Sequence, residues 1–249
     1  MGSSRMWAWL RIAGAIVAFS GVVAGFIVNF DRSTREGWDL GLVLTNYFSL
    51  FTILTSILTI VVLLVAALWS LRNPGTMREP FGIALGLAII SGPLLLLGIV
   101  YNVLLRGPPS GVAVEDSVGI AFADQWAAET LHVVLPLYLL VDLLFAPRRR
   151  GLPWWALGVV VAYPVVWVIY TMVRGTMVAN PDGSNPWWYP YPFLDPNGDG
   201  GYASAFTYIA VMTVGLILIG VLVIAIGRYR DRRASRREEA VEDAAKIVV

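Results

Sequence analysis

The stretch that decides the fold is LTNYFSLFTILTSILTIVVLLVAALWS, residues 44–70, which contains no charged side chain. About 20 apolar residues are enough for an α-helix to cross a hydrocarbon core of roughly 30 Å. The apolar residues form a continuous run and do not alternate with polar ones, so they indicate a helix and not a strand of a β-barrel. The stretch therefore predicts a membrane-spanning helix.

The rest of the chain has the same character. Of its 249 residues, 57% are hydrophobic and only 14% are charged, which is too apolar for a soluble domain. Further apolar windows lie near residues 8–30, 80–104, 125–146, 154–174 and 203–227. We predict an all-α, polytopic protein of the cell membrane, with six transmembrane helices in residues 1–227 and a charged cytoplasmic tail in residues 228–249.

Positive charge is concentrated in half of the predicted connections. Fourteen of the 18 Lys and Arg residues lie in the N-terminus, the loops at 71–79 and 147–151, and the C-terminal tail. Loops on the cytoplasmic side carry an excess of Lys and Arg, so this distribution predicts that both termini are cytoplasmic.

The last loop and the tail differ in composition. Residues 175–202 are rich in Pro, Gly, Trp and Tyr, which predicts a structured outer loop and not a flexible linker. The tail from residue 228 begins with a cluster of arginines. Such a cluster predicts contact with anionic lipid headgroups, with a simple stop-transfer anchor as the alternative. We expect no nucleic-acid partner.

Residues suited to metal binding are scarce. The chain has no cysteine and one histidine, so we expect no cysteine or histidine metal site and no cofactor. The segment DPNGDG, residues 195–200, matches the start of a calcium loop at Asp195, Asn197 and Asp199, but Phe206 stands where that loop requires a bidentate Glu. We expect an acidic turn here, with a calcium site as the weaker alternative.

The single histidine, His132, lies in the apolar segment AAETLHVVLPLY, residues 127–138. At 100° per residue, Gln125, Glu129 and His132 share one helix face, and Glu129 is close enough to hydrogen-bond and orient the imidazole. Pro136 predicts a kink one turn later. Ionisable groups inside a membrane are costly, so the pair indicates either a catalytic or proton-carrying site, or a polar pair that joins two helices.

The second helix carries a stripe of hydroxyl groups. They are spaced 4, 3, 4 and 3 residues apart, which places them on one face: Thr45, Ser49, Thr52, Ser56 and Thr59. Small hydroxyl residues let membrane helices pack closely, and this explains most of the stripe. A catalytic interpretation needs only one of them as a nucleophile activated by a base.

Depth in the membrane discriminates among these hydroxyls. Counted from the predicted cytoplasmic ends of their helices at Arg72 and Arg148, Ser56 and His132 both lie 16 residues inward. Thr45 lies 27 residues inward, and at about 1.5 Å per residue it is roughly 16 Å closer to the outer surface. Depth in straight helices therefore favours Ser56 or Thr52 as the partner of His132.

Other polar and aromatic residues in the outer halves of the helices are candidates for binding substrate or an oxyanion. They are Asn46, Tyr101, Asn102, Trp167, Tyr170 and Arg174. Interfacial aromatic belts explain many of these rings without a ligand. Arg174 would either receive a carboxylate or face lipid headgroups.

Four segments in order give the chain a resemblance to a known family: VLTNYFSLFT, GPLLLLGIVYN, LHVVLPLYLLVD and WWYPYPFLD. Together they resemble the six-helix membrane proteins that include the mammalian androgen-induced threonine hydrolases, and more closely the bacterial branch of that family. The mammalian members hydrolyse fatty acid esters of hydroxy fatty acids. The set of motifs covers most of the chain and is moderately specific.

The resemblance implies acyl transfer without a cofactor. Aligned through VLT and LHVVLP, it assigns the nucleophile to Thr45 and the base to His132, with Glu129 orienting the imidazole. This assignment conflicts with the depth argument, and we follow the resemblance because straight ideal helices are the weaker assumption. The expected partner is a membrane lipid or fatty-acyl ester substrate. The rival functions are a proton-coupled transporter or a small-molecule-binding membrane protein that uses Glu129 and His132, and a non-catalytic membrane scaffold.

Overall fold

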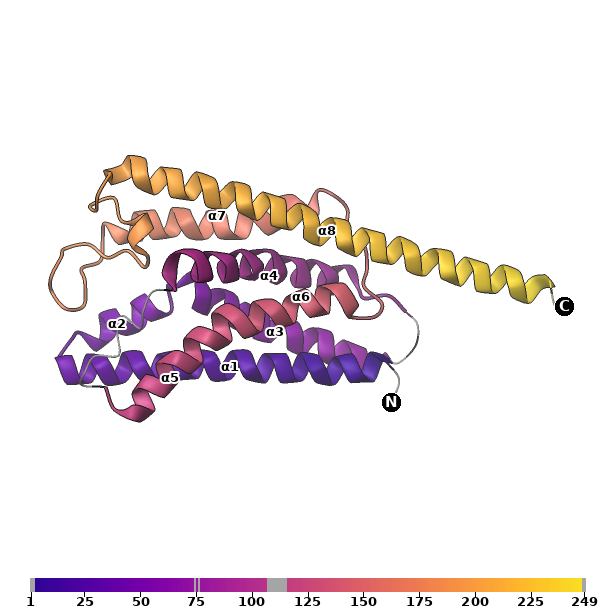
Figure 1. Cartoon of the computed structure of the whole chain (residues 1–249), viewed down its shortest axis with the longest axis horizontal. Helices are drawn as coiled ribbons and strands as arrows, with labels where there is room; N and C mark the ends of the chain where they lie inside the picture. The colour runs from indigo at the N-terminus through magenta and orange to yellow at the C-terminus, as the bar shows by residue number, and fades with distance from the viewer. Residues whose placement is uncertain (1–2, 74, 76, 107–115, 248–249) are drawn as a thin grey trace.

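The computed structural model describes residues 3–73, 75, 77–106 and 116–247, and these parts are helical and contain no strand. The α-helices, in chain order, are α1 (Ser3–Glu36), α2 (Leu40–Tyr47), α3 (Phe51–Arg72), α4 (Phe81–Val100), α5 (Val118–Glu129), α6 (Leu135–Phe145), α7 (Ala156–Gly175) and α8 (Gly201–Ile247). Two π-helices, η1 (Tyr101–Leu105) and η2 (Thr130–Val134), and one 3₁₀ turn, η3 (Pro192–Leu194), complete the elements. The long helices run side by side along the bundle (Figure 1).

Six of the described helical segments are long and apolar enough to cross a membrane. Two of them are composite, because α4 continues into η1 and α5 continues through η2 into α6. The predicted fold class, an all-α polytopic membrane protein with six spanning helices, is confirmed. In Figure 1, α1 begins and α8 ends at the same end of the bundle. We call this the terminal end, and we call the opposite end the loop end.

The prediction of one continuous helix over residues 44–70 is wrong for its first residues, because two helices occupy this stretch. α2 ends at Tyr47 and α3 begins at Phe51, with Leu50 between them in an extended conformation at φ −62° and ψ 133°. Ser49 lies in this break, and its carbonyl oxygen accepts a hydrogen bond of 2.9 Å from the indole nitrogen of Trp167. A partner 118 residues away in the chain stabilises the break, so the local sequence pattern did not reveal it.

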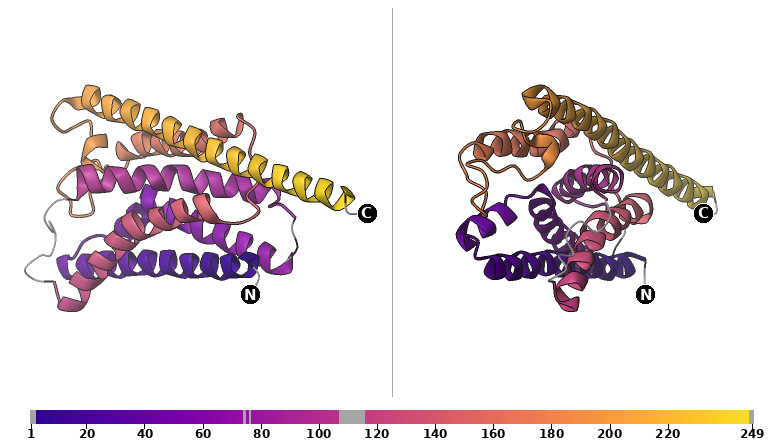
Figure 2. Two further views of the ribbon diagram at one scale, coloured as in Figure 1. Left: turned by 45° about the vertical axis from the view of Figure 1, so that its right-hand side comes forward. Right: turned by 60° about the vertical axis from the view of Figure 1, so that its left-hand side comes forward.

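The last helix was predicted to end near residue 227, and this prediction is wrong because the helix is longer. α8 continues through the charged tail to Ile247 and projects beyond the bundle (Figure 2). Residues 228–247 contain neither Gly nor Pro and are rich in Arg, Ala and Glu, which favour the helical conformation. The high charge of the tail therefore does not end the helix.

The core consists of two apolar clusters. One joins α1, α3, α4 and α6 around side chains such as Leu63, Leu94 and Leu139, which are fully buried. The other joins α4, α7 and α8 around Val160 and Ile224. α4 belongs to both clusters and is thus the central helix of the bundle.

An ionic network is buried near the terminal end. The guanidinium of Arg11 donates to Glu79 at 2.6 Å and to Asp142 at 2.9 Å, and Arg149 donates to the other oxygen of Asp142 at 3.0 Å. Each of the four residues is at most 5% exposed. Two positive and two negative charges therefore neutralise one another inside the protein.

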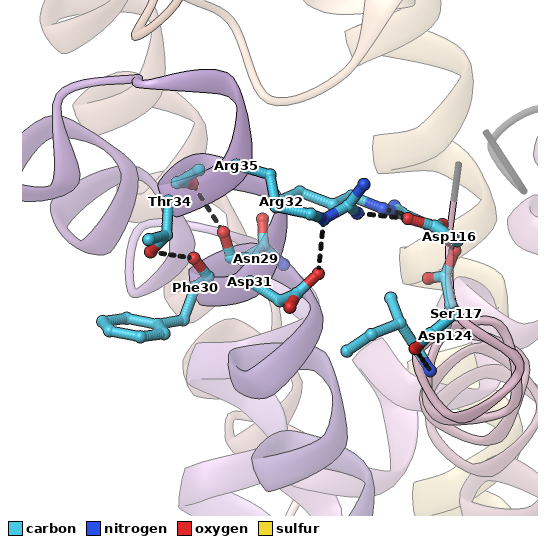
Figure 3. A network of polar contacts seen from close by, with 11 residues as sticks. Asn29, Phe30, Asp31, Arg32, Thr34, Arg35, Asp116, Ser117 and Asp124 are labelled. Carbon is cyan, nitrogen blue, oxygen red and sulfur yellow. Dashed lines mark hydrogen bonds and ion pairs between the residues drawn. The ribbon is translucent and has the colours of Figure 1, made fainter. Parts of the chain in front are cut away.

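A second ionic network lies at the loop end, where the end of α1 meets the start of α5 (Figure 3). Arg32 forms ion pairs with Asp116 at 2.7 Å and Asp124 at 2.8 Å. Arg35 pairs with Asp31 at 2.8 Å and also with Asp116. Hydrogen bonds from Arg32 and then from Arg35 lower the pKa of Asp116, although partial desolvation opposes them.

Candidate active site

The break between α2 and α3 sets the position of Thr52. Because α3 begins at Phe51, Thr52 is the second residue of that helix and its hydroxyl lies in the first turn. The first backbone N–H groups of a helix have no partner inside it, and together with the helix dipole they give this end a partial positive charge. Thr52 is 5% exposed, so the hydroxyl is enclosed by protein beside these N–H groups.

His132 is held in one orientation by the π-helix η2. Its Nδ1 lies 2.9 Å from the carbonyl oxygen of Ala128, and its Nε2 lies 3.3 Å from Oγ1 of Thr52. A carbonyl can only accept, so Nδ1 carries the proton and Nε2 presents its lone pair to the Thr52 hydroxyl. This is the arrangement that a base needs in order to take the proton of a hydroxyl nucleophile.

The other π-helix, η1, supports the imidazole from one side. The ring of Tyr101 stacks on the ring of His132 with 4.1 Å between centroids and an angle of 14° between planes. Gly98 in α4 allows this approach, since a Cβ there would lie 3.0 Å from Pro136 and 3.2 Å from the carbonyl oxygen of His132. Single π-helical turns are frequent at functional sites, and here one carries each ring of the stacked pair.

Tyr191, from the loop between α7 and η3, completes the group around Thr52. Its hydroxyl lies 3.3 Å from Oγ1 of Thr52 and faces the backbone N–H groups of Phe51 and Thr52. Burial raises the pKa of Tyr191, so the hydroxyl keeps its proton at neutral pH. Hydrogen bonds can therefore run in one direction, from Tyr191 to Thr52 and from Thr52 to Nε2 of His132.

An apolar cavity of about 430 Å³ lies on the other side of Tyr191. Side chains from α4, α7, α8 and the loop between α7 and α8 line it, and they include Leu97, Trp167, Tyr191 and Met212. A pocket of this size and character suits a hydrocarbon chain. Tyr191 belongs both to the cavity wall and to the group around Thr52, so the cavity and the Thr52–His132 pair are neighbours.

Thr45 lies on the other side of the helix break and does not meet His132. It is exposed on α2, and its hydroxyl donates to the carbonyl of Leu42 at 3.0 Å. Nη2 of Arg174 lies 3.4 Å from that hydroxyl and donates to Oδ1 of Asn46 at 2.7 Å. Thr45, Ser49 and Arg174 line an open groove of about 600 Å³ at the loop end.

The predicted support of His132 by Glu129 is not what the structure has. Glu129 pairs with Arg106, while Ala128 holds the imidazole. Arg106 also donates to Oδ1 of Asn102 at 2.7 Å, and the Asn102 amide donates to the carbonyl of Gly98 at 2.7 Å. Both polar groups of Asn102 are therefore used in local hydrogen bonds. The imidazole of His132 bonds the backbone carbonyl of Ala128, four residues earlier, and not the carboxylate of Glu129, three residues earlier.

The remaining predicted residues divide between the two sides of the break. Tyr170 hydrogen-bonds Ser49 at 2.9 Å beside the groove, and Trp167 lies against Phe51 with 4.9 Å between ring centroids. Gln125 is exposed on α5, away from this group. Ser56 is fully buried, and its hydroxyl has no hydrogen-bond partner in the described part of the chain.

The DPNGDG segment forms a local turn. Oδ1 of Asp195 accepts hydrogen bonds from both the backbone and the side chain of Asn197, each at 2.9 Å, and Asp199 lies in the turn that precedes α8. Across residues 3–73, 75, 77–106 and 116–247, no three or more His, Cys, Asp or Glu side chains are arranged to hold a metal ion. The segment thus forms an acidic turn, as expected, and the calcium alternative stays an untested prediction.

Two features of the site were not predicted from the sequence. Tyr191 lies in WWYPYPFLD, which was recognised as a motif but not as a source of site residues, and its aromatic density was the available signal. The start of α3 at Phe51 had no local signal, since no Gly or Pro lies between Leu44 and Thr52. Depth in the membrane had favoured Thr52 or Ser56, and Thr52 is the residue beside His132.

The comparisons with known proteins leave the site to be interpreted from its own geometry. No protein-family model matches the chain, and neither a search of curated proteins nor a search of solved structures returned a match. The resemblance to the six-helix threonine hydrolases therefore stays a hypothesis.

Proposed function

We propose that this chain is an intramembrane acyl-ester hydrolase of the cell membrane, with Thr52 as nucleophile and His132 as general base. The observation that supports this most is the oriented pair: Nδ1 of His132 is bound to the Ala128 carbonyl, and Nε2 faces the Thr52 hydroxyl at 3.3 Å. Catalytic hydrogen bonds are often long without substrate and shorten when it binds. The pair also agrees with the expected use of a threonine on helix two and a histidine on helix four, with Thr52 in the role first assigned to Thr45.

The reaction has two halves. Oγ1 of Thr52 attacks the ester carbonyl while Nε2 of His132 takes the hydroxyl proton, and the leaving alcohol receives that proton as its bond to the carbonyl carbon breaks. The acyl group then resides on Thr52. Water attacks the acyl-threonine, gives a proton to His132, and releases the acid as the proton returns to Oγ1.

The start of α3 supplies stabilisation for the oxyanion. Backbone N–H groups of the first turn and the protonated Tyr191 hydroxyl surround Thr52, and both can donate to an oxygen that becomes negative. Asn46 and Asn102 were also expected in this role, but the Asn102 amide donates to the carbonyl of Gly98 in α4. The amide nitrogen of Asn46 has no hydrogen-bond partner among the described residues, but Asn46 belongs to α2, on the other side of the helix break. The helix break thus supplies both the nucleophile and its electrostatic support.

The substrate class follows from the apolar cavity next to Tyr191 and from the groove on the α2 side of the helix break. The apolar cavity of about 430 Å³ suits an acyl chain. Arg174 lines the groove, and its Nη1 is buried without a hydrogen-bond partner among the described residues, so a carboxylate would pair with it after a side-chain movement that uncovers this atom. A long-chain ester that also carries a free carboxylate fits both features, and this is the chemistry of a fatty acid ester of a hydroxy fatty acid.

The test uses purified full-length protein in lipid nanodiscs, a fluorophosphonate probe and a panel of long-chain esters. We expect the wild-type protein to be labelled and to cleave esters, and Thr52→Ala to lose both activities while Thr52→Ser keeps part of them. Thr45→Ala and Ser56→Ala serve as matched controls and should keep both activities. Labelling that survives Thr52→Ala but disappears in Thr45→Ala would return the nucleophile to α2, and a wild-type protein that cleaves no acyl ester would refute the proposal.

A further inference from the structure

A large basic cavity lies at the terminal end, far from the proposed active site. It has a volume of about 1000 Å³ and lies among the start of α1, the end of α6 with the loop that follows it, the loop before α4, and the first turns of α8 beyond residue 225. Its arginines are Arg5, Arg78, Arg148, Arg149, Arg230, Arg233 and Arg237. Among the described residues of its lining, Glu238 is the only acidic one.

Most of this positive charge has no counter-charge within the described parts of the protein. Arg149 is paired with Asp142 in the buried network, and Arg78 is paired with Asp231 at 3.1 Å and Glu238 at 3.4 Å. The other five arginines of the cavity have no carboxylate within 4.0 Å among the described residues. The buried network does not offset them, because its own two carboxylates already neutralise Arg11 and Arg149.

The arginines are held in place by the fold. Arg148 has a left-handed backbone conformation with φ 61°, donates to the carbonyl of Asn73 at 2.6 Å and lies over the ring of Trp69. Arg230 donates to the carbonyl of Leu143 at 2.6 Å and also to that of Ala146. These contacts are made to neutral groups, so they fix the two guanidinium groups without cancelling their charge.

The tail of α8 presents its arginines in two sets. Arg230, Arg233 and Arg237 are spaced 3 and 4 residues apart, which places them on one helix face, and all three line the cavity. Arg232 and Arg236 do not line it, although Arg233 and Arg237 are as exposed as they are, so only the helix face separates the two sets. Simple attraction to a charged surface would not require this division, because it depends on total charge and not on the helix face.

We propose that this cavity binds a ligand with two or more phosphate groups. Guanidinium groups bind phosphate oxygens through paired hydrogen bonds, and several arginines around one space suit a multiply charged ligand. A volume near 1000 Å³ exceeds what a single phosphate needs. Leu144 and Ile226 line the same space at the end of the apolar helix spans, which suits the glycerol part of a lipid whose headgroup enters the cavity.

The experiment measures the thermal stability of the full-length protein in nanodiscs. Discs of phosphatidylcholine are compared with discs that also contain diphosphatidylglycerol, which has two phosphates, or phosphatidylglycerol, which has one, at equal total lipid charge. Inorganic pyrophosphate is titrated into the phosphatidylcholine discs as the soluble ligand. We expect stabilisation by diphosphatidylglycerol beyond that by phosphatidylglycerol, and stabilisation by pyrophosphate alone would still support the site but assign it to a soluble phosphate ligand.

The variants separate the cavity from general charge. Arg233→Gln with Arg237→Gln should weaken binding at least about tenfold, which corresponds to about 1.4 kcal/mol, whereas Arg232→Gln with Arg236→Gln removes the same charge and should change it little. Arg5 lines the cavity from α1, so Arg5→Gln tests the contribution of the cavity to binding without altering α8. Equal losses in the two α8 pairs, equal stabilisation by the two anionic lipids without any pyrophosphate effect, or no binding at all would overturn the proposal.

Discussion

Two polar regions lie inside the apolar bundle, and their hydrogen bonding differs. Near the terminal end, Arg11, Glu79, Asp142 and Arg149 are ionised groups joined by ion pairs of 2.6 to 3.0 Å, and each residue is at most 5% exposed. Nearer the loop end, Thr52 and His132 form a neutral pair with a bond of 3.3 Å. The first region has strong bonds between charges, and the second has one long bond between neutral groups.

This difference separates a structural role from a chemical one. Buried charges need partners of opposite sign, so removing one charge from the network leaves another unpaired in a region of low dielectric constant. The Thr52–His132 pair has a free lone pair, a weak bond and an apolar cavity beside it, and it can exchange its contacts for those of a substrate. We therefore expect substitutions in the network to change stability, and substitutions in the pair to change activity.

The largest effect is expected for His132→Gln. Without a base for Thr52, ester hydrolysis should fall by about 10³-fold or more, which is at least about 4 kcal/mol in the activation barrier. The melting temperature should change little, because the imidazole makes only two hydrogen bonds and glutamine retains polar atoms. Hydrolysis rates and thermal melts of the same preparation check both parts, and a large loss of stability with unchanged activity per folded molecule would reverse the comparison.

The next effect is expected for Asp142→Asn. The substitution removes the carboxylate shared by Arg11 and Arg149 and leaves two buried guanidinium groups with one remaining acid, Glu79. Breaking a buried ion pair by removal of one partner is expected to destabilise the fold by about 3–5 kcal/mol. Hydrolysis per folded molecule should stay near the wild-type rate.

Equilibrium unfolding of Asp142→Asn is to be compared with Asp124→Asn, a matched change at the loop end whose side chain is 41% exposed. Equal destabilisation by the two variants would show that burial of the network does not matter. An unstable Asp142→Asn protein that is also inactive per folded molecule would indicate that the two polar regions are coupled.

Much of the fold could be predicted from the sequence because each spanning helix must satisfy its backbone internally and cover about 30 Å of hydrocarbon. The length of the apolar runs therefore set the number of helices. The break before Phe51 depends on the hydrogen bond from Trp167 to Ser49, and no rule for residues 44–52 alone contains that partner. Tail residues 228–247 show the opposite error, where charge was interpreted as the end of a helix although the residues favour helix.

The candidate site was predicted in part for the same reason. His132 was recognised because an imidazole among apolar residues is conspicuous. Depth in the membrane favoured Ser56 or Thr52, but the nucleophile was assigned to Thr45 through the resemblance, and Thr52 is the residue beside His132. Helical spacing placed Glu129 near the imidazole, but spacing does not decide between competing partners, and Arg106 from another helix pairs with it. Tyr191 comes from an irregular loop, where no periodicity exists to predict the direction of a side chain.

A smaller effect, limited to substrates that carry a carboxylate, is expected for substitution of Arg174. Unlike Arg11, Arg174 has an enclosed Nη1 with no hydrogen-bond partner among the described residues. Arg174→Gln should raise the KM for a carboxylate-bearing ester by about tenfold or more, since a hydrogen bond to a charged group contributes about 1.5–3 kcal/mol. Turnover of a neutral ester of the same length should be unchanged, and an equal rise in KM for both esters would exclude a carboxylate contact.

The smallest effect is expected at the partly exposed ionic network between α1 and α5 (Figure 3). The Asp116 side chain is covered, but its partners Arg32 and Arg35 have side chains that are 26% and 32% exposed, so water and salt partly screen these pairs. Because the folded state lowers the pKa of Asp116, the carboxylate contributes stability above its unfolded pKa, near 3.8. That contribution is lost as the pH falls below 3.8 and through the folded pKa.

Acid and salt should therefore loosen the start of α5 while the buried network at the terminal end stays intact. Amide hydrogen exchange in residues 118–124 should increase at low pH or high salt, whereas exchange around Asp142 should not respond to salt. Asp116→Asn should raise exchange in residues 118–124 at neutral pH and reduce its salt dependence to that of the remaining Arg32–Asp124 pair. Protection of α5 that is unchanged in Asp116→Asn would mean that packing against α1, and not these ion pairs, holds the helix in place, and the two networks would then differ in role as well as in strength.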